Sequence, residues 1–90
     1  MRSWEKRIND VELVLVNWMR NQHISFTTPD DCIDELIRQG IYKTPIGKDT
    51  ALAFRTDLRS VRDTYGMPYD MGLIRIEQEA EYQNWYIYLK

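Results

Sequence analysis

The chain has 90 residues, a length that suits one small domain near the lower limit for burying an adequate core. Apolar residues make up 43% and charged residues 29%, which excludes the low-hydrophobicity, high-charge composition of disordered chains. The net charge of −2 argues against a protein that coats nucleic acid without sequence preference. We therefore expect a single domain over residues 1–90.

The cysteine content and the hydropathy pattern indicate the compartment. Cys32 is the only cysteine, so the chain cannot form an internal disulfide, which is typical of a reduced, cytoplasmic protein. The longest apolar stretch, residues 11–16, is interrupted by Glu12 and is too short to span a membrane. We expect a cytoplasmic protein without a membrane segment.

The first predicted element is a helix over residues 4–21, with Ser3 as its N-cap. Apolar residues recur there at steps of three, four and three, which matches one face of a helix. They are Ile8, Val11, Leu15 and Trp18. The β-branched and aromatic segment 23–28 (HISFTT) then predicts a brief strand.

The second predicted helix begins after Thr28 and ends before Gly40. Thr28 has a capping side chain, and Pro29 suits the first helical position. Asp30 and Asp31 follow at the positive end of the helix dipole. The predicted inward face consists of Ile33, Leu36 and Ile37. Segment 41–48 (IYKTPIGK) contains a proline and a glycine and is predicted to be a connection.

A third helix is predicted from Asp49 or Thr50 to Tyr65, with Gly66 as a left-handed residue at its end. Its apolar face contains Phe54, Leu58, Val61 and Tyr65. A second stripe contains Arg55, Arg59 and Arg62. At 100° per residue these arginines lie within about 60° of one another and about 90° from the apolar stripe. The helix therefore has a buried face and an adjoining basic face, and segment 41–62 has a local charge excess of +3.

Residues 71–90 are predicted to form two strands joined by a turn near residues 82–84. Apolar and other side chains alternate around Ile74 and Ile76, and again from Trp85 to Leu89. The order of elements is helix, short strand, helix, helix, strand, strand. This order is typical of the winged helix-turn-helix, an α+β fold in which a C-terminal β-hairpin wing covers a three-helix core and the third helix is presented outward.

Segment 54–70 (FRTDLRSVRDTYGMPYD), with the end of the last strand, resembles winged-helix DNA-binding domains of the DeoR and WYL-regulator type. The resemblance covers about the last two fifths of the chain. The matching residues are Arg55, Asp57, Leu58, Val61, Arg62, Gly66, Pro68, Tyr88 and Leu89. It implies that the third helix lies in the DNA major groove, with Arg55, Thr56 and Arg59 facing base edges or phosphates.

The remaining predicted DNA contacts surround that helix. The residues assigned to phosphates are Lys43, Lys48, Thr50 and Arg62. Arginine suits DNA because its planar fork can donate two hydrogen bonds to guanine. The alternative is a solvated face, in which Arg59 and Arg62 pair with Asp57 or Asp63 along the helix and the two lysines are plain loop residues.

The predicted hairpin is acidic and aromatic. Glu77, Glu79 and Glu81 crowd its tip, where a wing that grips phosphates would carry lysine or arginine, so we expect this wing to stay off DNA. Tyr86 and Tyr88 are predicted on the outward side of the last strand. An alternative function is therefore a protein–protein interaction module, an adaptor or inhibitor, whose acidic wing and tyrosines meet a basic partner.

Catalytic and metal chemistry find little support in the sequence. His23 is the only histidine and has no second histidine with which to build a metal site or a nucleophile–base pair. Cys32 lies at a helix start, where the dipole could lower its pKa, but a small half-buried residue is the favoured interpretation, because free cysteines usually serve as small hydrophobic residues. We predict no enzyme activity, no metal and no cofactor.

These patterns predict a small bacterial or phage transcriptional regulator that binds duplex DNA with sequence preference. One module of this size offers a modest interface, so we expect a homodimer in which two half-sites supply the remaining affinity.

Overall fold

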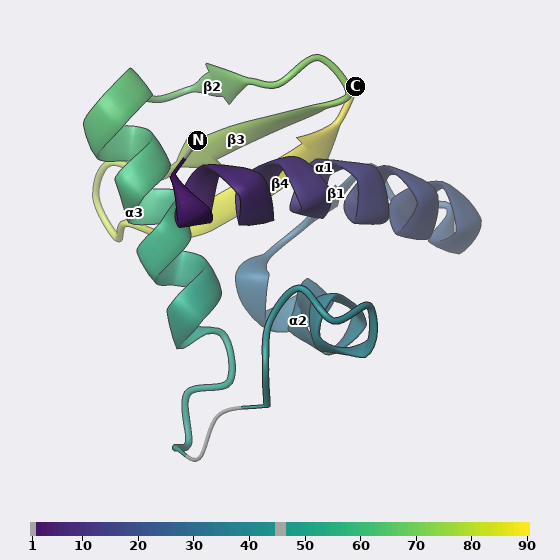
Figure 1. Ribbon diagram of the computed structural model, residues 1–90. Helices are drawn as coiled ribbons and strands as arrows, with labels where there is room; N and C mark the ends of the chain where they lie inside the picture. Colours follow the sequence, from purple (N-terminus) through teal and green to yellow (C-terminus); the bar gives the residue numbers. More distant parts are fainter. Residues whose placement is uncertain (1, 45–46) are drawn as a thin grey trace.

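The computed structural model describes residues 2–44 and 47–90, and within them the chain forms three helices and four strands (Figure 1). In chain order these are α1 (Ser3–Gln22), β1 (Phe26–Thr27), α2 (Pro29–Arg38), α3 (Leu52–Tyr65), β2 (Tyr69–Asp70), β3 (Ile74–Gln78) and β4 (Trp85–Leu89). The predicted α+β class is confirmed. Among the described residues, no helix has the length and apolar character needed to cross a membrane.

The four strands form one antiparallel sheet in the order β1-β4-β3-β2. The predicted hairpin is β3 and β4, in which Ile76 lies opposite Ile87. The predicted brief strand is β1, where Thr27 lies opposite Ile87 on the other side of β4. Strand β2 was not predicted, because its two residues are too short to show an alternating pattern.

The core lies between the helices and one face of the sheet. Figure 1 shows α1 running across the sheet and α3 near the first turns of α1. Helix α2 lies below α1 in this view. The three helices and the strands β3 and β4 contribute fully buried apolar side chains, as expected when one stripe of each helix and one face of the sheet are covered. The largest of them are Leu15, Met19, Leu36, Phe54, Leu58, Ile74, Ile76 and Ile87.

The ends of α2 agree with the prediction. The Thr28 hydroxyl accepts a hydrogen bond from the Asp31 backbone N–H at 3.3 Å, Pro29 is the first helical residue, and Gly40 beyond the end has a φ of +81°. Of the predicted inward face, Ile33 and Leu36 are buried and Ile37 is half-buried.

The ends of α1 and α3 require corrections. Ser3 is the first helical residue rather than the N-cap, because the carbonyl of Arg2 already accepts from the Lys6 N–H. Helix α3 begins at Leu52, after a turn, and not at residue 49 or 50. Gly66 has a φ of +81° but a ψ of 175°, so it ends α3 with an extended ψ instead of the left-handed helical conformation. Tyr65 is 51% exposed and not part of the core.

Candidate nucleic-acid interface

Helix α3 is fixed to the core along one stripe and leaves the opposite stripe in solvent. Phe54, Leu58 and Val61 are fully buried, at the predicted spacing of four and three. Thr56 and Arg59, three residues apart, are exposed on the other side. The helix therefore presents a solvent-facing surface while its orientation is set by packing.

A buried carboxylate adds a polar anchor to this packing. Asp57 accepts hydrogen bonds from Arg7 of α1, at 2.7 Å from Nε and 3.0 Å from Nη2, and from the Tyr42 hydroxyl at 2.7 Å. The Asp57 side chain is only 5% exposed. Burial, together with the Asp57 carboxylate, raises the pKa of Tyr42. The interpretation that placed Asp57 on the solvated face beside Arg59 or Arg62 is wrong, because Asp57 faces α1.

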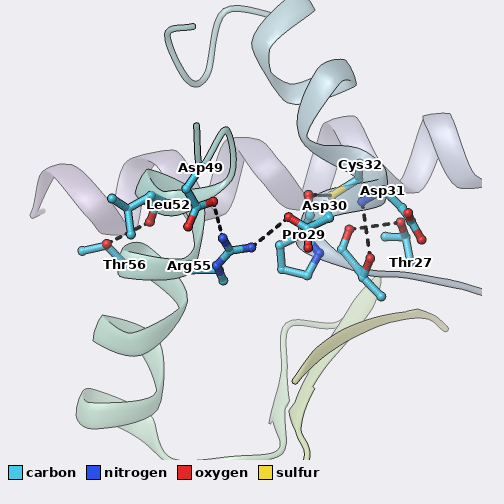
Figure 2. Close-up of polar contacts among 10 residues, drawn as sticks. Thr27, Pro29, Asp30, Asp31, Cys32, Asp49, Leu52, Arg55 and Thr56 are labelled. Carbon is cyan, nitrogen blue, oxygen red and sulfur yellow. Dashed lines mark hydrogen bonds and ion pairs between the residues drawn. The ribbon is translucent and has the colours of Figure 1, made fainter. Parts of the chain in front are cut away.

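Arg55 joins three segments of the chain. Its Nη1 is 2.9 Å from Asp30 Oδ1 in the first turn of α2, and its Nη2 donates to Asp49 in the connection (Figure 2). Burial lowers the pKa of Arg55, but the two carboxylates outweigh it and raise the pKa. The Arg55 side chain is 22% exposed, so it lies at the surface with both carboxylates already in contact.

The other two arginines of the predicted stripe differ from each other. Arg62 donates from Nε to Asp63 and from Nη1 to Gln78 of β3, both at 3.1 Å, and its guanidinium carbon lies 5.9 Å from the centre of the Trp85 ring. This contact with Asp63 is one of those predicted for a solvated face. Arg59 is exposed, and it forms no hydrogen bond or ion pair with any part of the chain that the structure describes.

The predicted polar contacts around α3 are also at the surface. Thr56 is exposed, and its hydroxyl donates to the Leu52 carbonyl at 2.9 Å, as drawn in Figure 2. Lys48 and Thr50 are exposed, and the contact between their neighbour Asp49 and Arg55 places them at the start of α3. Lys43 is exposed directly after buried Tyr42. Pro45 and Ile46, which belong to the predicted connection, lie outside the described residues.

The charge around α3 is more balanced than segment 41–62 alone indicates. The local excess of +3 counts Arg55, but Asp30, from a different segment, contacts its guanidinium. Asp31 and Asp34 of the same helix are exposed as well. A charge count along the sequence cannot show this compensation of charge, because residues 30 and 55 are neighbours only in the folded chain.

The second predicted surface lies on the hairpin, where Glu77 is within β3 and not at the tip, and one neighbouring residue was not predicted. Glu77 lies opposite Tyr86, and Glu79 Oε2 accepts from the Tyr86 hydroxyl at 3.3 Å. The Glu79 charge raises the pKa of Tyr86. Phe26 of β1 also belongs to this surface, since it lies opposite Tyr88. The place of Phe26 on this surface follows from the pairing of β1 with β4, which the sequence pattern does not predict.

The groups with catalytic potential are dispersed or buried. Among residues 2–44 and 47–90, no three His, Cys, Asp or Glu side chains are grouped so that they could hold a metal ion. Cys32 is fully buried, its Sγ donates to the Pro29 carbonyl at 3.8 Å, and burial raises its pKa to about 12. The hypothesis that the helix dipole lowers this pKa is therefore wrong, because desolvation dominates.

Comparison with known proteins gave no match among family models, curated proteins or solved structures. Function has to be inferred from the arrangement of elements and from the side chains that α3 and the sheet expose.

Proposed function

We propose that this chain is a winged helix-turn-helix protein that binds duplex DNA with sequence preference and acts as a small cytoplasmic regulator in a bacterium or a phage. The arrangement of three helices with a C-terminal hairpin supports the proposal, and so does the resemblance of segment 54–70 to DeoR and WYL-type regulators. In this proposal α3 is the recognition helix and the β3–β4 hairpin is the wing.

The observation that carries the proposal is the exposed stripe of α3. An arginine without a partner in the described chain, Arg59, and a threonine three residues before it stand on the solvent side of a helix whose other side is buried. A free guanidinium can donate two hydrogen bonds to guanine O6 and N7, and threonine can contact either polar base edges or a thymine methyl group. Arg59 and Thr56 are therefore the proposed base-reading pair.

The other residues proposed to contact DNA differ in whether they already have partners within the protein. Lys43, Lys48 and Thr50 are exposed and suit phosphates, which attract any nearby cation. Arg55 and Arg62 have partners within the protein, so each has to exchange an intramolecular contact for a phosphate or a base. The interface of one module remains small, and two copies on two half-sites are proposed to supply the remaining affinity.

The test is binding to a random-sequence duplex library, followed by fluorescence anisotropy at about 50 and about 200 mM salt. Arg59→Ala removes the proposed base contact and should weaken binding by roughly tenfold or more, since a good arginine–guanine pair contributes about 1–3 kcal/mol. Arg20→Ala is the matched control. Arg20 is exposed in the last turn of α1, whereas α3 lies near the first turns of that helix. Absence of binding at the lower salt, or equal effects of the two variants, would contradict the proposal.

A second function, as a protein-interaction module, is favoured by one specific observation. The face of the sheet opposite the core carries contacting aromatic rings, and exposed or half-buried carboxylates lie beside them. This surface is different from the exposed stripe of α3, so the two functions can be tested separately.

A further inference from the structure

The outward face of the sheet has a group of three aromatic side chains, here called the aromatic patch: Phe26, Tyr86 and Tyr88. The ring of Phe26 is centred 6.3 Å from that of Tyr86 and 6.0 Å from that of Tyr88, and the two tyrosine rings are 6.4 Å apart. Phe26 is 50% exposed. Tyr86 and Tyr88 are half-buried. Partly exposed aromatic rings that gather on the surface of a small protein are typical of an interaction surface.

Carboxylates border the aromatic patch along the hairpin. Glu77 lies directly opposite Tyr86, and Glu79 accepts a hydrogen bond from the Tyr86 hydroxyl. Glu81 is exposed in the turn that follows. The combination of ring faces and negative charge opposes phosphate binding and favours a cationic side chain.

The chain itself shows how this surface holds an arginine. The guanidinium carbon of Arg75 lies 5.4 Å from the centre of the Tyr88 ring, and Arg75 donates from Nε to Glu77 at 3.0 Å. Tyr86, the next outward residue along β4, has the same combination of a ring and a neighbouring carboxylate, Glu79. Within the described residues no lysine or arginine lies over the Tyr86 ring. Tyr86 therefore has a ring and a nearby carboxylate, as Tyr88 has, although here the carboxylate contacts the tyrosine hydroxyl and the described chain places no cation over the ring.

We infer that the aromatic patch and the hairpin carboxylates bind an arginine-bearing segment of a partner protein. An arginine of the partner stacks on Tyr86 and Phe26 and pairs with Glu79. Arginine fits better than lysine because its guanidinium is planar, weakly hydrated and able to donate two parallel hydrogen bonds to a carboxylate. The inference names the partner chemistry of the second function proposed above and does not depend on DNA binding by α3.

A cleft next to the patch gives such a segment a place to continue. It has a volume of about 480 Å³ and lies where the hairpin meets the start of α2. Its lining includes Tyr86, Asn84, Asp30 and Arg55, and the Asp30 carboxylate already contacts the Arg55 guanidinium. The Asn84 amide oxygen is the group there that suits a backbone N–H of an extended segment.

The experiment uses two fluorescein-labelled peptides of equal charge, one alternating arginine with serine and the other lysine with serine. We expect the arginine peptide to bind roughly tenfold more tightly than the lysine peptide, as stacking on the rings requires. Tyr86→Leu should reduce arginine-peptide binding by at least about fivefold, and Tyr86→Phe, which keeps the ring, should retain most of it. Thermal unfolding of each variant separates loss of binding from loss of structure.

Matched control variants distinguish specific binding at the aromatic patch from general attraction between opposite charges. Glu79→Gln and Asp34→Asn each remove one negative charge from an exposed or half-buried position, but only Glu79 borders the patch. Glu79→Gln should weaken binding of the arginine peptide more than Asp34→Asn does. Equal effects of the two variants, or equal binding of the two peptides, would overturn the inference.

The same variants separate this inference from the DNA proposal. Arg59→Ala should impair duplex binding and leave peptide binding unchanged, and Tyr86→Leu should do the reverse. If Tyr86→Leu abolished duplex binding instead, the patch would be part of a nucleic-acid surface and the inference would be overturned. Failure of duplex binding in every variant would contradict the DNA proposal alone.

Discussion

Two clusters of arginine and carboxylate side chains connect α3 to the rest of the protein, and they differ in how deeply the carboxylates are buried. Asp57 and Arg55 are two residues apart and so point to different sides of the helix. In the first cluster the carboxylate of α3 is buried, with its side chain 5% exposed, whereas in the second the side chains of Asp30 and Asp49 are 77% and 45% exposed. The same chemistry therefore serves two purposes, because burial decides how costly it is to break the contact. Breaking the buried contacts of Asp57 should therefore cost more free energy than breaking the exposed contacts of Arg55.

The largest effect is expected from Asp57→Ala. It removes the acceptor for Arg7 and for the buried Tyr42 hydroxyl, and we expect the free energy of unfolding to fall by about 3 kcal/mol. Urea denaturation measures this. Asp63→Ala is the control, since Asp63 is 68% exposed on the same helix, and it should change stability by no more than about 0.5 kcal/mol. A loss below about 1 kcal/mol for Asp57→Ala would show that the buried cluster is no stronger than the surface one.

Tyr42→Phe tests one bond of the buried cluster and its pH dependence. The ring contact with Phe54, at 5.6 Å between centroids, is kept, so near pH 8 the loss should be about 1 kcal/mol. Burial and Asp57 raise the pKa of Tyr42 in the folded state, so its contribution is present below about pH 10 and is lost as the pH rises further. The stability advantage of the wild type over Tyr42→Phe should therefore shrink to near zero by about pH 11. An advantage that stays constant over this range would contradict the assignment.

The two clusters also show what the sequence could predict. Local signals were sufficient for the start of α2, for most of the apolar stripes of the helices and for the hairpin, because capping by Thr28, the spacing of apolar residues and the alternation after Trp85 act over neighbouring residues. Tyr65 is the exception, since it follows the spacing but is exposed. The direction in which a charged residue faces is different. Asp57 and Arg55 both look like surface residues of an amphipathic helix until α1, α2 and the connection are in place.

The candidate sites divide in the same way. Arg59 and Thr56 were predicted at the surface of α3 and lie there, as do Lys48 and Thr50 at its start. The partners of Arg55 and the membership of Phe26 in the aromatic patch depend on pairs distant in sequence, Asp30 with Arg55 and β1 with β4. Such pairs are set by tertiary packing, which local periodicity does not encode.

The surface cluster is expected to control binding more than stability. Asp30→Asn with Asp49→Asn releases Arg55, and the free energy of unfolding should change by about 1 kcal/mol or less. Under the proposed DNA function, the freed guanidinium can contact a phosphate, so duplex affinity should rise and the dependence on salt should steepen by about one phosphate contact. Anisotropy titrations at several salt concentrations measure both quantities.

Arg55→Gln added to that double variant is the control for the surface cluster. If Arg55 makes the new contact, the gain in affinity and the steeper salt dependence should both disappear. If they persist, the gain comes from removing negative charge in general, and Asp30 and Asp49 do not act through Arg55.

The alkylation rate of Cys32, at the start of α2, reports on both clusters. Its thiol is fully buried and burial raises its pKa to about 12, so alkylation near pH 8 requires the structure to open. In Asp57→Ala, a loss of about 3 kcal/mol should accelerate labelling by roughly a hundredfold if opening is global. In Asp30→Asn with Asp49→Asn, the rate should stay within a few fold of the wild type, because the exposed contacts of Arg55 contribute little to stability. Comparable acceleration in both variants would mean that Arg55 fixes α2 against α3 as firmly as Asp57 fixes α3 against α1, and a contact of that strength would not exchange readily for DNA.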